Sequence, residues 1–151
     1  MSNTNHTYKV IQLTNKALGA QAVNTYLPLG TITRKINCKN YQSVPFSVGN
    51  SNDNIVAINE PGYYKVTYNA SLVATAAGIV TINLVNNGDV IYSVSATATE
   101  GGTVPLSLTY EIRLCPNSEC NPYNLPVNVQ MQLVTTAITD GTSNIIIEKV
   151  Y

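Results

Sequence analysis

The sequence predicts an all-β protein, a ten-stranded antiparallel jelly-roll sandwich, and three observations carry this prediction. Apolar and polar residues alternate with a period of two along several segments, which is the pattern of half-buried strands. Turn-forming dipeptides, among them Pro61-Gly62 and Asn87-Gly88, separate these segments at short intervals. No segment shows a convincing helical period. Short antiparallel strands joined by closely spaced turns are typical of a sandwich or jelly roll.

Residues 61–72 predict a central strand of this sandwich. After the Pro61-Gly62 break, strict alternation gives the strand two different faces. We expect one face to fill the core and the other to point away from it. The first face comprises Tyr64, Val66, Tyr68, Ala70 and Leu72, and the second comprises Tyr63, Lys65, Thr67, Asn69 and Ser71.

The remaining strands are expected, in chain order, at residues 8–13, 30–37, 44–48, 55–58, 79–85, 90–96, 104–114, 127–133 and 145–151. Pro45 places its strand at a sheet edge, because proline cannot donate to a strand ladder. Asn87-Gly88 predicts a tight hairpin, since both turn positions need a positive φ. Residues 14–28 are expected to form a loop, because Gly19 and the flanking asparagines disfavour a helical turn. Asp140-Gly141 is expected to be a turn.

The closing strand is apolar on both faces. Ile145, Ile147 and Tyr151 share one face, and Ile146 and Val150 share the other. A strand of this kind is covered on both sides. In a two-sheet sandwich only one face meets the core, so a second subunit is the simplest cover for the other face.

Length, charge and hydropathy limit the classes of protein to which the chain can belong. A chain of 151 residues suits one domain, and we expect a head domain at residues 7–151 preceded by a flexible arm at residues 1–6. Eight basic and eight acidic residues cancel, so the surplus of positive charge that nucleic-acid binding needs is missing. No apolar run approaches the roughly 20 residues of a membrane helix, which argues against membrane insertion. The polar N-terminus lacks the pattern of a signal peptide, so the protein is expected to stay where it is made or to leave within a larger particle.

The three cysteines, Cys38, Cys115 and Cys120, are an odd number, which argues against a disulfide framework. The spacing of Cys115 and Cys120 leaves two alternatives, a small disulfide-closed loop and reduced thiols, and the missing export signal favours the thiols. A zinc site would need Cys38 or His6 as further ligands, and both are distant in sequence.

Nothing in the sequence indicates catalysis or a cofactor. His6 is the only histidine, and it lies in a polar arm that nothing rigid would hold in place as a general base. The chain has no nucleophile elbow and no phosphate-binding glycine loop. Calcium at Asp53 or Asp140 is an alternative to ordinary turn chemistry, and turn chemistry explains both residues more simply. We therefore expect a non-enzymatic protein without a cofactor or metal.

An ordered set of segments resembles a known family. Pro61-Gly62-x-Tyr64-x-Val66-x-Tyr68 resembles the Pro-Gly-x-Tyr-x-Phe-x-Tyr strand of the jelly-roll heads shared by complement component q and tumour necrosis factor, with Val66 in place of the usual Phe. Residues 79–88, 103–114 and 145–150 are similar to later strands of that family, so the resemblance covers residues 7–151. In its Asn- and Thr-rich character the chain is most similar to bacterial and bacteriophage versions of the head.

The resemblance implies a homotrimer about a three-fold axis. The sheet that holds the first strand, the 61–72 strand and the last strand would face that axis. The implied interface residues are Tyr63, Thr67 and Tyr151, together with either Ile145 and Ile147 or Ile146.

Two functions follow from the resemblance. The first is a trimeric component of a bacteriophage virion surface, a capsid decoration or head-fibre protein, made in the host cytoplasm and docked to other virion proteins through its N-terminal arm. The alternative is the receptor- or glycan-binding head of a fibre or spore-surface protein. The loop tyrosines Tyr26, Tyr41 and Tyr123 are then the candidate ligand contacts.

Overall fold

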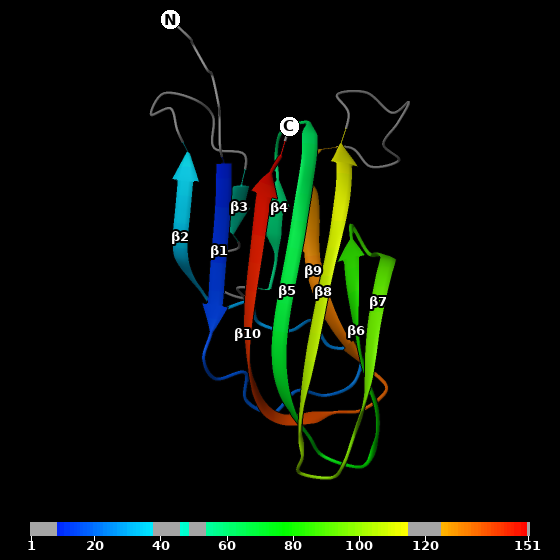
Figure 1. Cartoon of the computed structure of the whole chain (residues 1–151). Helices are drawn as coiled ribbons and strands as arrows, with labels where there is room; N and C mark the ends of the chain where they lie inside the picture. The colour runs from blue at the N-terminus through cyan, green and yellow to red at the C-terminus, as the bar shows by residue number, and fades with distance from the viewer. Residues whose placement is uncertain (1–8, 38–45, 49–53, 115–124, 151) are drawn as a thin grey trace, which may run out of the picture.

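The computed structural model describes residues 9–37, 46–48, 54–114 and 125–150, which form two antiparallel five-stranded sheets packed face to face (Figure 1). Sheet A has the strand order β2-β1-β10-β5-β8, and sheet B has the order β3-β4-β9-β6-β7. The strands are β1 (Lys9–Asn15), β2 (Thr31–Asn37), β3 (Phe46–Val48), β4 (Val56–Ile58), β5 (Gly62–Ala74), β6 (Gly78–Asn86), β7 (Asp89–Ala98), β8 (Thr103–Leu114), β9 (Val127–Val134) and β10 (Ile138–Lys149). The prediction of an all-β sandwich with ten strands is confirmed.

β5 is an interior strand of sheet A and has the two faces that its alternation predicts. It lies between β10 and β8 and pairs with both along most of its length. The side chains of Tyr64, Val66, Tyr68, Ala70 and Leu72 are buried between the sheets. Tyr63, on the opposite face, remains 36% exposed. The predicted core set of this strand is therefore correct.

Short-range signals locate most of the other elements. Asn87 and Gly88 have φ values of 49° and 87°, so they form the expected tight hairpin between β6 and β7. β3 lies at the edge of sheet B, as predicted for the segment that follows Pro45. No helix occurs in the described ranges, and none of their segments could cross a membrane as a helix.

The segment between β1 and β2 is a loop that closes one end of the sandwich. Leu18, Leu27 and Leu29 are buried in the core. The backbone of this loop is tied to the second half of the chain by hydrogen bonds from Gln21 N to Ile138 O, 3.0 Å, and from Leu27 N to Met131 O, 2.8 Å. The loop assignment is confirmed, and the three buried leucines of this loop line one end of the core.

The prediction of a turn at Asp140-Gly141 is wrong, because both residues lie within β10. The chain turns earlier, between β9 and β10, where Thr135 has a φ of 75°. Glycine is needed at position 141 because the chain packs closely there, not because it turns. A Cβ atom built on it would lie 2.6 Å from the backbone oxygen of Ser71 and 3.1 Å from a methyl carbon of Leu18.

Candidate functional site

The outer face of sheet A, which points away from the core, is the candidate site. Antiparallel register aligns its side chains in rows that cross β1, β10, β5 and β8. The rows are Val10–Glu148–Lys65–Glu111, Gln12–Ile146–Thr67–Thr109 and Thr14–Asn144–Asn69–Ser107. The face therefore changes from a charged row to a mixed row and then to a wholly uncharged polar row.

Apolar side chains gather at the end of this face where β5 begins. Tyr63 is 36% exposed and Val150 is 42% exposed. Their strands are joined there by a hydrogen bond of 2.8 Å from Val150 N to Tyr63 O. The guanidinium of Arg113 on β8 lies 5.5 Å from the centre of the Tyr63 ring, within range of a cation–π interaction. We call this cluster of Tyr63, Val150 and Arg113 the tyrosine end of the outer face.

The structure sorts the predicted interface residues into three groups. Tyr63 and Thr67 lie on the outer face, as predicted from the parity of β5. Ile145 and Ile147 are 1% and 0% exposed and belong to the protomer core, so their assignment to an interface is corrected. Ile146 occupies the outer face in their place, half-buried opposite Thr67. Tyr151 lies outside the described residues.

The uncharged row on the outer face is held together by side-chain hydrogen bonds. The Oδ1 atom of Asn144 accepts two of them, from Gln12 Nε2 at 2.9 Å and from Thr14 Oγ1 at 3.1 Å. Thr14 Oγ1 also lies 3.2 Å from the hydroxyl of Thr33 on β2. On the β8 side, the hydroxyl of Ser107 donates to Asn69 Oδ1. These bonds give the two asparagine amides a defined orientation.

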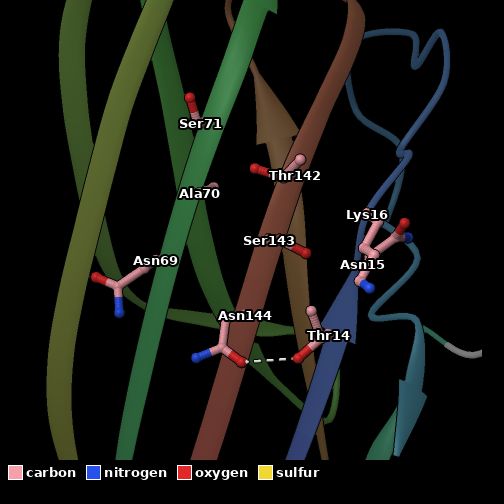
Figure 2. A pocket seen from close by; sticks show the side chains of 9 residues that line it. All are labelled: Thr14, Asn15, Lys16, Asn69, Ala70, Ser71, Thr142, Ser143 and Asn144. Carbon is pink, nitrogen blue, oxygen red and sulfur yellow. Dashed lines mark hydrogen bonds between the residues drawn. The ribbon is translucent and has the colours of Figure 1, made fainter. Parts of the chain in front are cut away.

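A hollow of about 350 Å³ opens beside this row (Figure 2). We call it the polar hollow. Its side chains come from the end of β1, from the middle of β5 and from β10. It is lined by Thr14, Asn15, Lys16, Asn69, Ala70, Ser71, Thr142, Ser143 and Asn144. None of the lining residues is acidic, and Lys16 supplies the one formal charge.

Two buried hydroxyls lie next to the hollow. Ser143 is 5% exposed and Tyr68 is 1% exposed, and neither hydroxyl makes a regular hydrogen bond within the described part of the chain. Burial raises the pKa of Tyr68 to about 12, and the nearby Ser143 hydroxyl opposes that rise. The Tyr68 hydroxyl therefore stays protonated at neutral pH.

An ion cluster lies at the same end of the sandwich as Tyr63. The Glu60 carboxylate, just before β5, accepts hydrogen bonds from Lys9 Nζ of β1 at 2.9 Å and from Lys149 Nζ of β10 at 2.6 Å. Burial by itself would raise the pKa of Glu60, but the bonds from Lys149 and Lys9 outweigh it and lower the pKa. The hydroxyl of Tyr64 donates to the backbone oxygen of Glu60 at 2.7 Å. No local sequence pattern predicts this cluster, because it depends on the pairing of β1 with β10.

A second apolar surface lies where β7 and β8 close the edge of the sandwich. The rings of Tyr92 and Tyr110 stack with centres 5.2 Å apart and an angle of 29° between their planes. Tyr92 is 42% exposed and Val90, two residues earlier on β7, is 52% exposed. We call this surface the β7–β8 seam. No local sequence signal identifies it, since the contact joins two different sheets.

The remaining predicted site residues are only partly placed. Tyr26 is half-buried and bridges to Gln132 of β9, so much of its surface is used in packing. Tyr41 and Tyr123 lie outside the described residues. So do the arm at residues 1–6, Asp53 and the cysteines Cys38, Cys115 and Cys120. Within the described ranges, no three His, Cys, Asp or Glu residues gather as a metal site would require.

Comparison with known proteins identifies the fold. No family model and no curated protein sequence matches the chain. Among solved structures, the globular domain of a zebrafish complement 1qA protein matches with a TM-score of 0.63 at 8% identity, covering 95% of this chain and 98% of that one. The Eiger tumour necrosis factor of S. frugiperda matches with a TM-score of 0.65 at 8% identity, covering 97% of this chain and 94% of that one. The vertex protein P5 of PRD1 matches with a TM-score of 0.54 at 12% identity, covering 95% of this chain and 97% of that one.

Proposed function

We propose that this C1q/TNF-like jelly-roll sandwich is a structural head domain that assembles as a homotrimer on a bacteriophage virion, as a capsid decoration or head-fibre protein. The observation that carries the proposal is the outer face of sheet A. There Tyr63, Val150 and the half-buried Ile146 leave apolar surface on the side that the core does not use. The C1q/TNF fold commonly forms trimers, which provides a cover for such a face.

A closed trimer requires two different surfaces on each protomer, because a three-fold contact is heterologous. The tyrosine end of sheet A is one candidate surface, and the β7–β8 seam is the other. Both expose a tyrosine beside a valine, which is the kind of apolar surface that a partner subunit can cover. In the proposed trimer the seam of one protomer packs against the tyrosine end of the next.

The virion setting is supported by composition and by fold. The chain carries only 11% charged residues, which is about half the share of typical domains. One of the structures with the same fold is a vertex protein of PRD1. In this proposal residues 1–6 form the arm that docks the head to another virion protein. The C1q/TNF fold is typically non-catalytic, and we propose no enzymatic activity.

The first test measures the oligomeric state of the purified protein and of a Tyr63→Glu variant by size-exclusion chromatography with light scattering. We expect the natural protein to have three times the protomer mass of 16.3 kDa. Tyr63→Glu should give folded monomers, because it places a charge in the interface while the partly exposed position tolerates it in the protomer. Ile79→Glu, at a position that is 53% exposed on sheet B, is the matched control and should remain trimeric.

A monomeric natural protein at micromolar concentration would contradict the trimer. The virion role has a separate test. Trimers should co-sediment with phage particles that lack this protein, and deletion of residues 1–6 should abolish co-sedimentation without changing the trimer. Equal co-sedimentation of the intact and shortened proteins would refute the role of the arm.

A further inference from the structure

The polar hollow on sheet A presents several hydrogen-bond donors and no carboxylate. Asn144 Oδ1 is occupied by Gln12 and Thr14, which leaves its amide N–H groups free within the described structure. Asn69 Oδ1 accepts from the hydroxyl of Ser107, so the amide N–H groups of Asn69 are also free within the described structure. Asn15, by contrast, uses both its amide nitrogen and its oxygen in hydrogen bonds to the backbone of the loop.

The two free amides lie next to each other. Asn144 and Asn69 are directly paired across β10 and β5, and Thr142 and Ser71 form the next pair on the same face. In Figure 2 the nitrogen of Asn144 points toward β5, on the side opposite its bond to Thr14. The hydroxyls of Ser71 and Thr142 make no hydrogen bond with other described residues and can donate as well.

The charge of the hollow agrees with its donors. Lys16 makes no ion pair or hydrogen bond with the described part of the chain, and no carboxylate lines the hollow. Asp140 lies two residues before Thr142 on β10 but is not part of the lining, and its carboxylate accepts the N–H of Gly19 at 3.0 Å. The hollow is therefore a donor-rich surface with one positive charge.

We propose that the polar hollow binds an oxyanion, a phosphate or carboxylate group, through the amides of Asn69 and Asn144, the hydroxyls of Ser71 and Thr142, and the ammonium group of Lys16. Hydrogen bonds from amide and ammonium donors to an ionised acceptor are stronger than those between neutral groups. The orientation of both amides is already set by Gln12, Thr14 and Ser107, so little side-chain entropy is lost on binding.

This inference does not depend on the proposed trimer, because all five residues belong to one chain. Along β5 the hollow begins at Asn69, about 20 Å from Tyr63 at 3.3–3.4 Å per residue. The hollow and the tyrosine end are thus different parts of the outer face. The oligomeric state and the binding of an anion can be measured on the same sample, so failure of one proposal is distinguishable from failure of the other.

The test is an NMR titration that follows the side-chain amide signals of Asn69 and Asn144. The probes are inorganic phosphate, glycerol 3-phosphate and glucuronate, with chloride at equal ionic strength as the reference. We expect saturable shifts of both amide signals with phosphate. Stronger binding of glycerol 3-phosphate would indicate a phosphate group on a larger molecule, and stronger binding of glucuronate would indicate an acidic sugar.

Asn144→Asp is the decisive variant. It keeps the oxygen that accepts from Gln12 and Thr14 but removes the free N–H donors and adds a negative charge. Binding of phosphate should weaken by about tenfold or more, equivalent to at least one charge-assisted hydrogen bond. Lys16→Gln should weaken it by a smaller factor. The matched control is Asn83→Asp on sheet B, whose Oδ1 likewise accepts from a neighbouring hydroxyl, that of Ser93.

The proposal is overturned if neither amide signal responds to any probe up to high millimolar concentration, which would make the hollow an ordinary hydrated surface. It is also overturned if Asn144→Asp binds phosphate as tightly as the natural protein and the Asn83→Asp control do.

Discussion

Among single residues, Glu60 stands out because its side chain pairs with residues near both ends of the described chain. Its carboxylate is shared by two ammonium groups, those of Lys9 and Lys149, and the three side chains are 18%, 4% and 17% exposed. A partly buried cluster with two cations and one anion is stable only while the anion is charged. The cluster joins the first strand, the last strand and the segment before β5, so it fastens the end of sheet A where residues distant in sequence meet.

The state of Glu60 predicts how stability depends on pH. Because the folded protein lowers the pKa of Glu60 below the ordinary value of 4.5, the unfolded chain binds the proton more tightly. This contribution to the free energy of unfolding is therefore present above pH 4.5 and is lost as the pH falls through the lower, folded pKa. Glu60→Gln should remove that part of the acid dependence and cost about 1–3 kcal/mol at neutral pH, since a buried and a partly buried ammonium group lose their partner.

Urea unfolding at a series of pH values measures both effects. Glu111→Gln changes an exposed carboxylate on β8 and should alter the free energy of unfolding at neutral pH by less than about 0.5 kcal/mol. If Glu60→Gln loses stability on acidification as steeply as the natural protein, the cluster does not contribute in this way.

Among the elements, β10 shows that alternation predicts which residues share a face but not which face meets the core. Its alternation correctly indicates that Ile145 and Ile147 share one face and Ile146 the other. Both faces are apolar, however, so parity alone does not tell which one meets the core. β5 posed no such difficulty, because Lys65, Thr67 and Asn69 mark its outer face as polar. The prediction of a turn at Asp140-Gly141 is wrong for a related reason, because a glycine needed for close packing against Ser71 cannot be told from a turn glycine by sequence.

Gly141→Ala tests that reading of β10. The new Cβ would lie 2.6 Å from the backbone oxygen of Ser71, which cannot move without disturbing the pairing of β10 with β5. We expect a loss of about 1–3 kcal/mol in the free energy of unfolding, as for other overpacked sites. Ser143→Ala, two residues later, removes a buried hydroxyl without a regular partner and should change stability by less than about 1 kcal/mol. Equal stability of Gly141→Ala and the natural protein would contradict a requirement for glycine in this close packing.

For the whole molecule, the strand inventory and the core could be predicted from sequence, whereas surfaces built by long-range pairing could not. Alternation and turn residues are local, so they identify nearly every strand. The Glu60 cluster and the polar hollow each combine strands that are far apart in the chain, and the β7–β8 seam joins consecutive strands that belong to different sheets. Their residues have no shared motif, and they meet only through the order of strands in sheet A or, at the seam, through the packing of one sheet on the other.

The same order of strands makes the geometry of assembly testable. In a heterologous trimer each contact joins the tyrosine end of one protomer to the β7–β8 seam of the next, so Tyr92→Glu should disrupt it as Tyr63→Glu does. In an isologous dimer through sheet A alone, Tyr92→Glu would associate normally, because the seam would remain outside the contact.

Mixing the two variants distinguishes these geometries further. A Tyr63→Glu protomer keeps an intact seam, and a Tyr92→Glu protomer keeps an intact tyrosine end. In an equimolar mixture these two intact surfaces can pair once. The two damaged surfaces of the resulting pair cannot add a third protomer, so no ring closes. Light scattering should show monomers for each variant alone and a shift toward a heterodimer for the mixture. A mixture that stays monomeric would contradict direct contact between the two surfaces, and trimers of Tyr92→Glu alone would remove the seam from the interface.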